Sequence, residues 1–189
     1  MSSSDGGTPN HEVLRRLNED HSRMVKVMDA LEEALRVDEH DDLNWVRIAD
    51  IISYLQEYPD AVHHPLEDQL FDRVLDKGLT PAERELVHFN LAQHAEIIGA
   101  TQRLERDVSS ILSDIVVPFD QLREQLKHYL ELQRLHMRNE NNHLFPLAER
   151  LLADEDWAEL AAEAAAHADP MFDLRVGKFT GLYDYITNR

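Results

Sequence analysis

Residues 80–111, TPAERELVHFNLAQHAEIIGATQRLERDVSSI, predict one long amphipathic helix. Thr80 is a typical N-cap, Pro81 suits the first turn and Glu83 can complete a capping box. Farther along, the residues of one face recur at alternating steps of three and four. That face comprises Leu86, Asn90, His94, Ile97, Thr101, Leu104, Val108 and Ile111. Because a single helix cannot bury such a face by itself, the stretch must pack against other helices.

Three more stripes of the same period lie on either side of this stretch. They extend over residues 14–35, 45–74 and 119–151, and the acidic residues 38–42 separate the first from the second. Pro59 and Pro65 are expected to bend or break the second helix. Short connections between four such helices favour antiparallel neighbours. The predicted fold class is therefore all-α, an antiparallel up-down four-helix bundle with a short C-terminal helical appendage.

The chain has 189 residues, 43% of them apolar, which is enough for one sizeable core and too little for several independent domains. We expect a disordered leader over residues 1–9, which carry no recognisable motif. The bundle is expected over residues 10–152. Residues 153–189 are predicted to form a C-terminal helical extension, with an alanine-rich helix around Trp157 and a break at Asp169-Pro170.

The composition excludes several classes of function. No cysteine is present, so disulfides, thiolate metal sites and thiol nucleophiles are ruled out. The net charge of −18 disfavours nucleic acid and anionic membranes as partners. No apolar run reaches the roughly 18 residues that a membrane span needs, and residues 1–8 lack the apolar segment of a signal peptide. These features predict a soluble, cytoplasmic protein in which any metal is bound by nitrogen and oxygen.

The chain has 11 histidines, and each of the four predicted helices places one of them in its buried stripe. A buried histidine or carboxylate must be paired, hydrogen-bonded or metal-bound, because leaving it unsatisfied is costly. Two of these histidines are followed four residues later by a glutamate, a spacing that puts both side chains on one helix face. The candidate metal ligands are His21, His63, Glu67, His94, His136 and Glu140.

Positions along the helices provide an independent test, since each helical residue rises about 1.5 Å. From the turn near Gly78, His63 lies roughly 15 residues back and His94 roughly 16 forward, a mismatch near 1.5 Å. From the turn at residues 114–118, His94 lies about 20 residues back and His136 about 18 forward. His21 and His63 match more loosely, to roughly 6 Å, which the prolines could absorb. We therefore expect the four histidines to share one layer.

Four imidazoles and two carboxylates in one layer predict a dinuclear site, with two histidines on each metal and both glutamates bridging. Nitrogen and oxygen ligands without thiolate suit iron, manganese or zinc. Positions left open on the metals would let a small ligand bind, such as dioxygen, peroxide or nitric oxide.

Four stretches around these residues resemble the hemerythrin-like HHE cation-binding family, over roughly residues 10–152. The stretches are NEDHSRM (18–24), VHHPLEDQLF (62–71), LAQHAEI (91–97) and HMRNENNHLFPLAERL (136–151). The resemblance implies a hemerythrin-like bundle in which the six candidate ligands hold two non-haem iron ions, joined by an oxo or hydroxo bridge. Zinc or manganese is expected as an alternative occupant in a recombinant preparation.

Two positions differ from the oxygen-carrying hemerythrins. Helix three would there show HxxxH, but Asn90 and Ile98 stand four residues from His94. The last helix would there show HxxxxD, but Asn141 stands at the final position and the carboxylate is Glu140. The candidate ligand set of four histidines and two glutamates is more similar to that of the di-iron iron-sulfur repair proteins, whose cysteine-bearing N-terminal region this chain lacks.

Several interpretations stay open at this point. His64 points about 100° away from His63 on an ideal helix, which favours a supporting or surface role over a ligand role. His143 lies seven residues after His136 and could supply a fifth histidine, or else a hydrogen bond in the core. The favoured function is binding or sensing of dioxygen or a related diatomic. Turnover of peroxide or nitric oxide, iron storage and a regulatory role are the alternatives, so enzymatic activity and a protein partner are left undecided.

Overall fold

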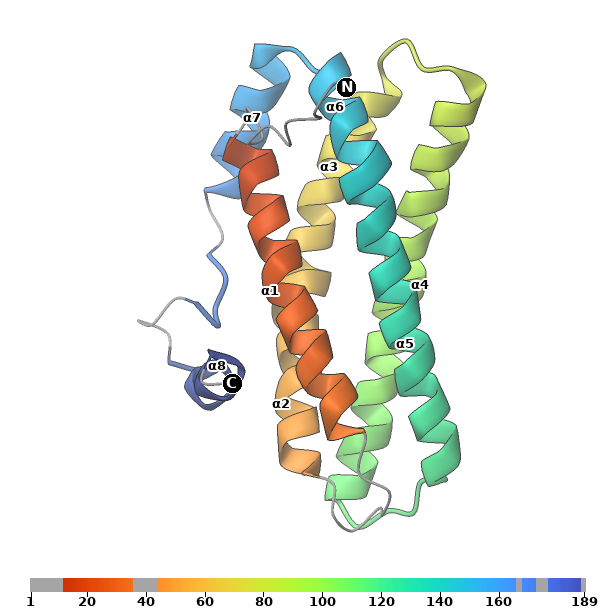
Figure 1. The fold of residues 1–189 in the computed structure, drawn as a ribbon, viewed down its shortest axis with the longest axis vertical. Helices are drawn as coiled ribbons and strands as arrows, with labels where there is room; N and C mark the ends of the chain where they lie inside the picture. The colour runs from red at the N-terminus through yellow and green to blue at the C-terminus, as the bar shows by residue number, and fades with distance from the viewer. Residues whose placement is uncertain (1–11, 36–43, 166–167, 173–176, 188–189) are drawn as a thin grey trace, which may run out of the picture.

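The computed structural model describes residues 12–35, 44–165, 168–172 and 177–187, and the regular elements of these residues are all helical. Four long helical rods lie side by side along the long axis of the molecule (Figure 1). The predicted leader at 1–9 and the acidic stretch at 38–42 lie outside the described residues. The rods comprise α1 (Glu12–Ala34); α2 (Trp45–Leu55), η2 (Gln56–His63) and α3 (His64–Leu75); α4 (Pro81–Leu112); and α5 (Phe119–Asn139), η3 (Glu140–Leu144) and α6 (Phe145–Leu151).

The second and fourth rods each contain a π-helical segment. In η2 the backbone N–H of His64 donates to the carbonyl of Pro59, five residues earlier. In η3 the N–H of Phe145 donates to the carbonyl of Glu140 in the same pattern. Pro59 lies inside η2, so the predicted interruption of the second helix is confirmed there, because proline has no N–H for the α-helical ladder. Both π-helical segments border the polar layer of the core, and such segments frequently mark functional sites.

The start of α4 matches the sequence prediction. Thr80 is the N-cap, its side chain accepts from the backbone N–H of Glu83, and the Glu83 carboxylate accepts from the backbone N–H of Thr80 at 2.8 Å. Pro81 occupies the first helical turn. At the other end, Asp114 adopts a positive φ of 59° as the chain leaves α4 and turns toward α5.

The apolar core is divided into two clusters by a layer of polar side chains. One cluster includes Met24, Ile51 and Tyr54, and the other includes Leu17, Phe71 and further residues toward α6. The buried polar side chains on the four rods are Asp20, His21, His63, His64, Glu67, Asn90, Gln93, His94, Thr101, Gln133, His136 and Glu140. The helical periodicity of the sequence therefore directs this polar layer inward together with the apolar residues.

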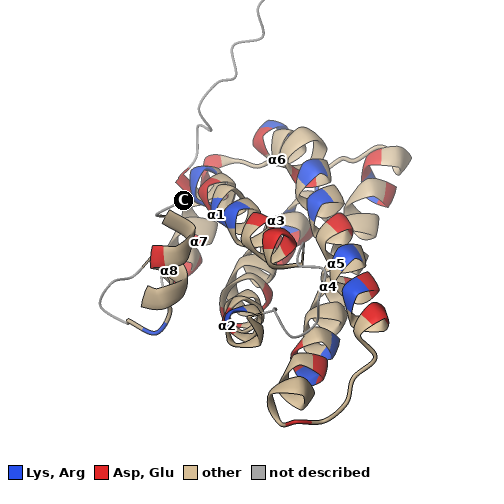
Figure 2. Ribbon diagram, turned by 60° about the horizontal axis from the view of Figure 1, so that its bottom comes forward, with Lys and Arg blue, Asp and Glu red and all other residues tan. Residues whose placement is uncertain are grey.

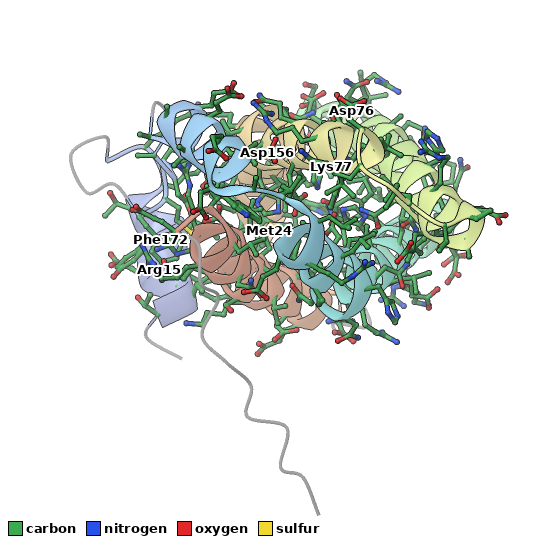
Figure 3. All side chains as sticks on the ribbon, turned by 90° about the horizontal axis from the view of Figure 1, so that it is seen from above. Arg15, Met24, Asp76, Lys77, Asp156 and Phe172 are labelled. Carbon is green, nitrogen blue, oxygen red and sulfur yellow. The ribbon has the colours of Figure 1, made fainter. Side chains whose placement is uncertain are left out.

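Residues after Leu152 pack against the rods as two short helices. α7 (Asp154–Ala164) contacts α1 and α3, and α8 (Thr180–Thr187) contacts α1 and α2. Seen from above, Lys77 lies next to Asp156, and their ion pair of 2.8 Å joins the end of α3 to α7 (Figure 3). The proposed domain boundary at residue 152 stays a prediction.

Acidic and basic residues are mixed along the outer faces of the helices (Figure 2). None of the described helices combines the length and the apolar character that crossing a membrane would require.

We expect Thr80→Ala to lower the free energy of unfolding by about 1 kcal/mol, because the first-turn N–H of Glu83 loses its acceptor. Urea unfolding of the full chain would measure the change. Gln102→Ala, at an exposed position inside α4, is the control and should change stability by less than about 0.5 kcal/mol. Equal stability of the two variants would contradict the capping role.

Candidate metal centre

The structure brings all six predicted ligand side chains into the polar layer. One comes from α1, two from the junction of η2 and α3, one from α4, and two from the junction of α5 and η3. None of them is more than 3% exposed. These are His21, His63, Glu67, His94, His136 and Glu140.

Glu67 lies between imidazoles that come from three different rods. Its Oε1 is 3.3 Å from Nε2 of His21 and 3.2 Å from Nε2 of His63. Its Oε2 is 3.6 Å from Nε2 of His94. The two oxygens of one carboxylate therefore face two separate groups of histidines.

Glu140 repeats this arrangement from the fourth rod. Its Oε1 is 3.2 Å from Nε2 of His136 and 3.5 Å from Nε2 of His94, while its Oε2 is 3.4 Å from Nε2 of His21. Asn90 donates from Nδ2 to Oε1 at 2.6 Å and so fixes the carboxylate in its orientation. Both glutamates thus present one oxygen to each side of the cluster, as a pair of bridging ligands would.

An outer ring of polar side chains orients the imidazoles. In three of them Nδ1 meets a side-chain oxygen: His21 with Asn141 at 2.9 Å, His63 with Asp20 at 3.4 Å, and His94 with Asp68 at 2.6 Å. A donor at Nδ1 leaves the lone pair of Nε2 directed inward, which is the tautomer that a metal ligand requires. The sequence predicted no role for these three hydrogen-bond acceptors, although each of them directly precedes or follows a candidate ligand in the chain.

The Asp20 contact continues outward to Tyr58. The hydroxyl of Tyr58 donates to Oδ2 of Asp20 at 2.8 Å and accepts from Arg16 at 3.2 Å. Burial and the charge of Asp20 raise the pKa of Tyr58, so its hydroxyl keeps its proton for this hydrogen bond. His63 is therefore held by a chain of contacts that crosses from α1 to η2.

The buried carboxylates and imidazoles of the cluster shift one another's pKa values. Burial opposes a positive charge on His63, but the carboxylates of Glu67 and Asp20 outweigh burial and raise the pKa of His63 to about 10. Burial also opposes ionisation of Glu67, yet the neighbouring imidazoles hold the pKa of Glu67 well below its usual range. In contrast, burial lowers the pKa of His136 to about 4. The buried carboxylates of Glu67 and Asp20 therefore attract positive charge, which protons or metal cations can supply.

Hydrogen bonding inside the cluster is incomplete, and a cation would complete it. Among the described residues, Nε2 of His21, Nε2 of His63 and both oxygens of Glu67 have no hydrogen-bond partner. Two overlapping groups have their possible ligand atoms within 4.8 Å of one another, His21 with His63 and Glu67, and His64 with Glu67, His94 and His136. Inward-facing nitrogens and oxygens without partners fit two metal ions that share Glu67.

The two additional histidines of the sequence prediction lie in different surroundings. His64 is fully buried beside the cluster. His143 is exposed, so the expectation that it supplies a fifth histidine ligand or a hydrogen bond in the core is wrong for this structure. That expectation assumed an unbroken α-helix, whereas η3 changes the phase of the helix between the two residues.

We expect Asp68→Asn to weaken metal binding about 10- to 100-fold, because the variant removes the charge that holds Nδ1 of His94. Asp68 is partly exposed, so the fold should tolerate the change. Competition with a chelator would measure the affinity. Asp72→Asn removes the same charge from the exposed side of the next turn and should leave the affinity unchanged. Equal losses in the two variants would indicate a general charge effect instead.

Comparison with known proteins gives one result in agreement with this geometry. A family model described as the hemerythrin HHE cation-binding domain matches residues 12–148. No curated protein and no solved structure matches the chain significantly. The matched residues cover most of the chain and include every side chain of the buried His/Glu cluster. The chain therefore belongs to the hemerythrin HHE cation-binding domain family.

Proposed function

We propose that this protein is a non-haem di-iron protein, built as an antiparallel up-down four-helix bundle, that binds or senses dioxygen or a related diatomic molecule. One observation carries the proposal: Glu67 and Glu140 each present one oxygen to both sides of a buried cluster of histidines. Connections of a few residues at 76–80 and 113–118 join successive rods, which supports antiparallel neighbours.

The residues divide into two sets around the shared carboxylates. His21 and His63 would hold one iron, and His94 and His136 the other, with Glu67 between them. Imidazole and carboxylate ligands suit iron, although manganese and zinc accept the same donors. Bound iron would supply a redox-active centre with room for an exogenous ligand.

The surroundings of the cluster favour a small, uncharged ligand. The polar layer has apolar clusters on both sides, and the ring of Phe145 stacks on His21 with centroids 5.4 Å apart. Such surroundings exclude bulk water and penalise a ligand that needs many hydrogen bonds. A diatomic molecule meets this condition, which is why we favour it over a larger substrate.

We expect the full chain to bind two iron ions and Glu67→Ala to bind at most one, because both sides of the cluster lose an oxygen ligand. Elemental analysis after anaerobic loading would give the stoichiometry. Metal-free protein should melt roughly 10–20 °C lower than protein in which the free metal exceeds the dissociation constant of each of the two sites a hundredfold. Glu85→Ala, at an exposed position of α4, is the control and should retain two ions. Retention of both ions by Glu67→Ala would contradict the shared-carboxylate arrangement.

We expect reduced, iron-loaded protein to change its visible absorption when it is mixed with dioxygen, and to regain the first spectrum when dioxygen is removed. Stopped-flow mixing followed by an argon purge would measure both steps. Protein that holds two irons yet shows no change would refute dioxygen binding. Sustained consumption of hydrogen peroxide or nitric oxide in proportion to the iron content would assign turnover in place of reversible binding.

A further inference from the structure

We propose that His64 is a further metal ligand of this centre, which gives one cation position three imidazoles and the other position two. The inference rests on the proposed dinuclear centre and adds a residue to it. The three imidazoles of the first position are those of His64, His94 and His136, and Glu67 completes this group.

The spacing around Glu67 brings both adjacent histidines into reach. On an ideal helix Glu67 lies about 40° from His63, four residues earlier, and about 60° from His64, three residues earlier. The carboxylate therefore projects between the two imidazoles. Consecutive histidines that point about 100° apart can then serve two cations, one on each side of a shared glutamate.

The ring of His64 packs most closely on a ligand of one side, although the ring of His63 on the other side also meets it edge-on with centroids 5.7 Å apart. Its ring stacks on that of His94, with centroids 4.7 Å apart and an interplanar angle of 20°. The ring of His136 meets it edge-on at 5.6 Å. A possible ligand atom of His64 lies within 4.8 Å of those of Glu67, His94 and His136.

Hydrogen bonding gives an independent reason. His64 is 0% exposed, and neither of its ring nitrogens has a hydrogen-bond partner among the described residues. Its Nδ1 faces Oδ1 of Asp60 at 3.5 Å, one turn earlier in η2. A buried imidazole in this state is unfavourable unless both nitrogens are satisfied. A cation at Nε2, with Asp60 as the acceptor for Nδ1, would satisfy both of them.

The fourth rod provides an internal comparison. His63, His64 and Glu67 have the same spacing as His136, Met137 and Glu140. Met137 is buried and apolar at the position equivalent to His64. An apolar side chain is therefore enough to fill this position of the motif. The histidine on the second rod adds ring nitrogens that can bind a metal, which the fourth rod lacks at this position.

Cobalt(II) titration of the metal-free full chain would test the role of His64. The unmodified protein should bind two ions in steps of unequal affinity, with the tighter step at the position that has three imidazoles. In His64→Leu the tighter step should weaken at least tenfold or disappear, and the visible absorption of the tighter-bound cobalt should change. Met137→Leu perturbs the equivalent position without removing a candidate ligand, so both steps should be retained.

Circular dichroism would show whether the His64→Leu variant keeps its helices. If that variant loses them, His64→Gln, which retains a polar side chain, takes its place in the titration. Two ions bound with unchanged affinities and spectrum in a folded His64 variant would overturn the inference and leave the dinuclear centre standing. An unmodified protein that fails to bind two ions would overturn both proposals.

Discussion

Glu67 and Glu140 place two carboxylates at complete burial inside a helical bundle, and the rest of the polar layer is arranged around them. Charges removed from water in this way must be compensated nearby, because the interior offers little screening. Compensation comes from imidazoles on all four rods, so the rods must hold a common register along their length. The apolar clusters on either side of the layer supply the packing that keeps this register.

Support for the centre extends beyond the imidazoles. Asp20 receives a hydrogen bond from Tyr58 and faces both His63 and Arg23. Arg23 also lies 3.6 Å from Asp169, whose carboxylate accepts from Tyr54 at 3.1 Å. The segment after the bundle is thus connected, through charged and hydrogen-bonded side chains, to the residue that orients a candidate ligand. Changes in this segment can reach the centre through electrostatics as well as through packing.

The two differences from the oxygen-carrying hemerythrins acquire a physical meaning in this structure. Asn90 donates to Glu140, and Asn141 accepts from Nδ1 of His21, so each amide holds a side chain of the cluster in place. An amide can do this without adding a negative charge to a layer that already contains the carboxylates of Asp20, Glu67 and Glu140. The family match establishes a cation-binding domain, and the two amides orient side chains of the ligand set that we propose.

The amino-acid sequence determined the features that depend on local spacing. Helical periodicity, the Thr80 capping box and the four-residue interval between His63 and Glu67 all arise within one or two turns, and the family motifs add the expected order of ligands. Only the tertiary structure decided the phase of the helices at the two π-helical segments, since an N–H can bond four or five residues back and packing selects between them. That choice left His143 exposed and buried His64 beside Glu67. The tertiary structure also brings Asn90 on the third rod against Glu140 on the fourth, a contact between residues 50 positions apart that no local pattern encodes.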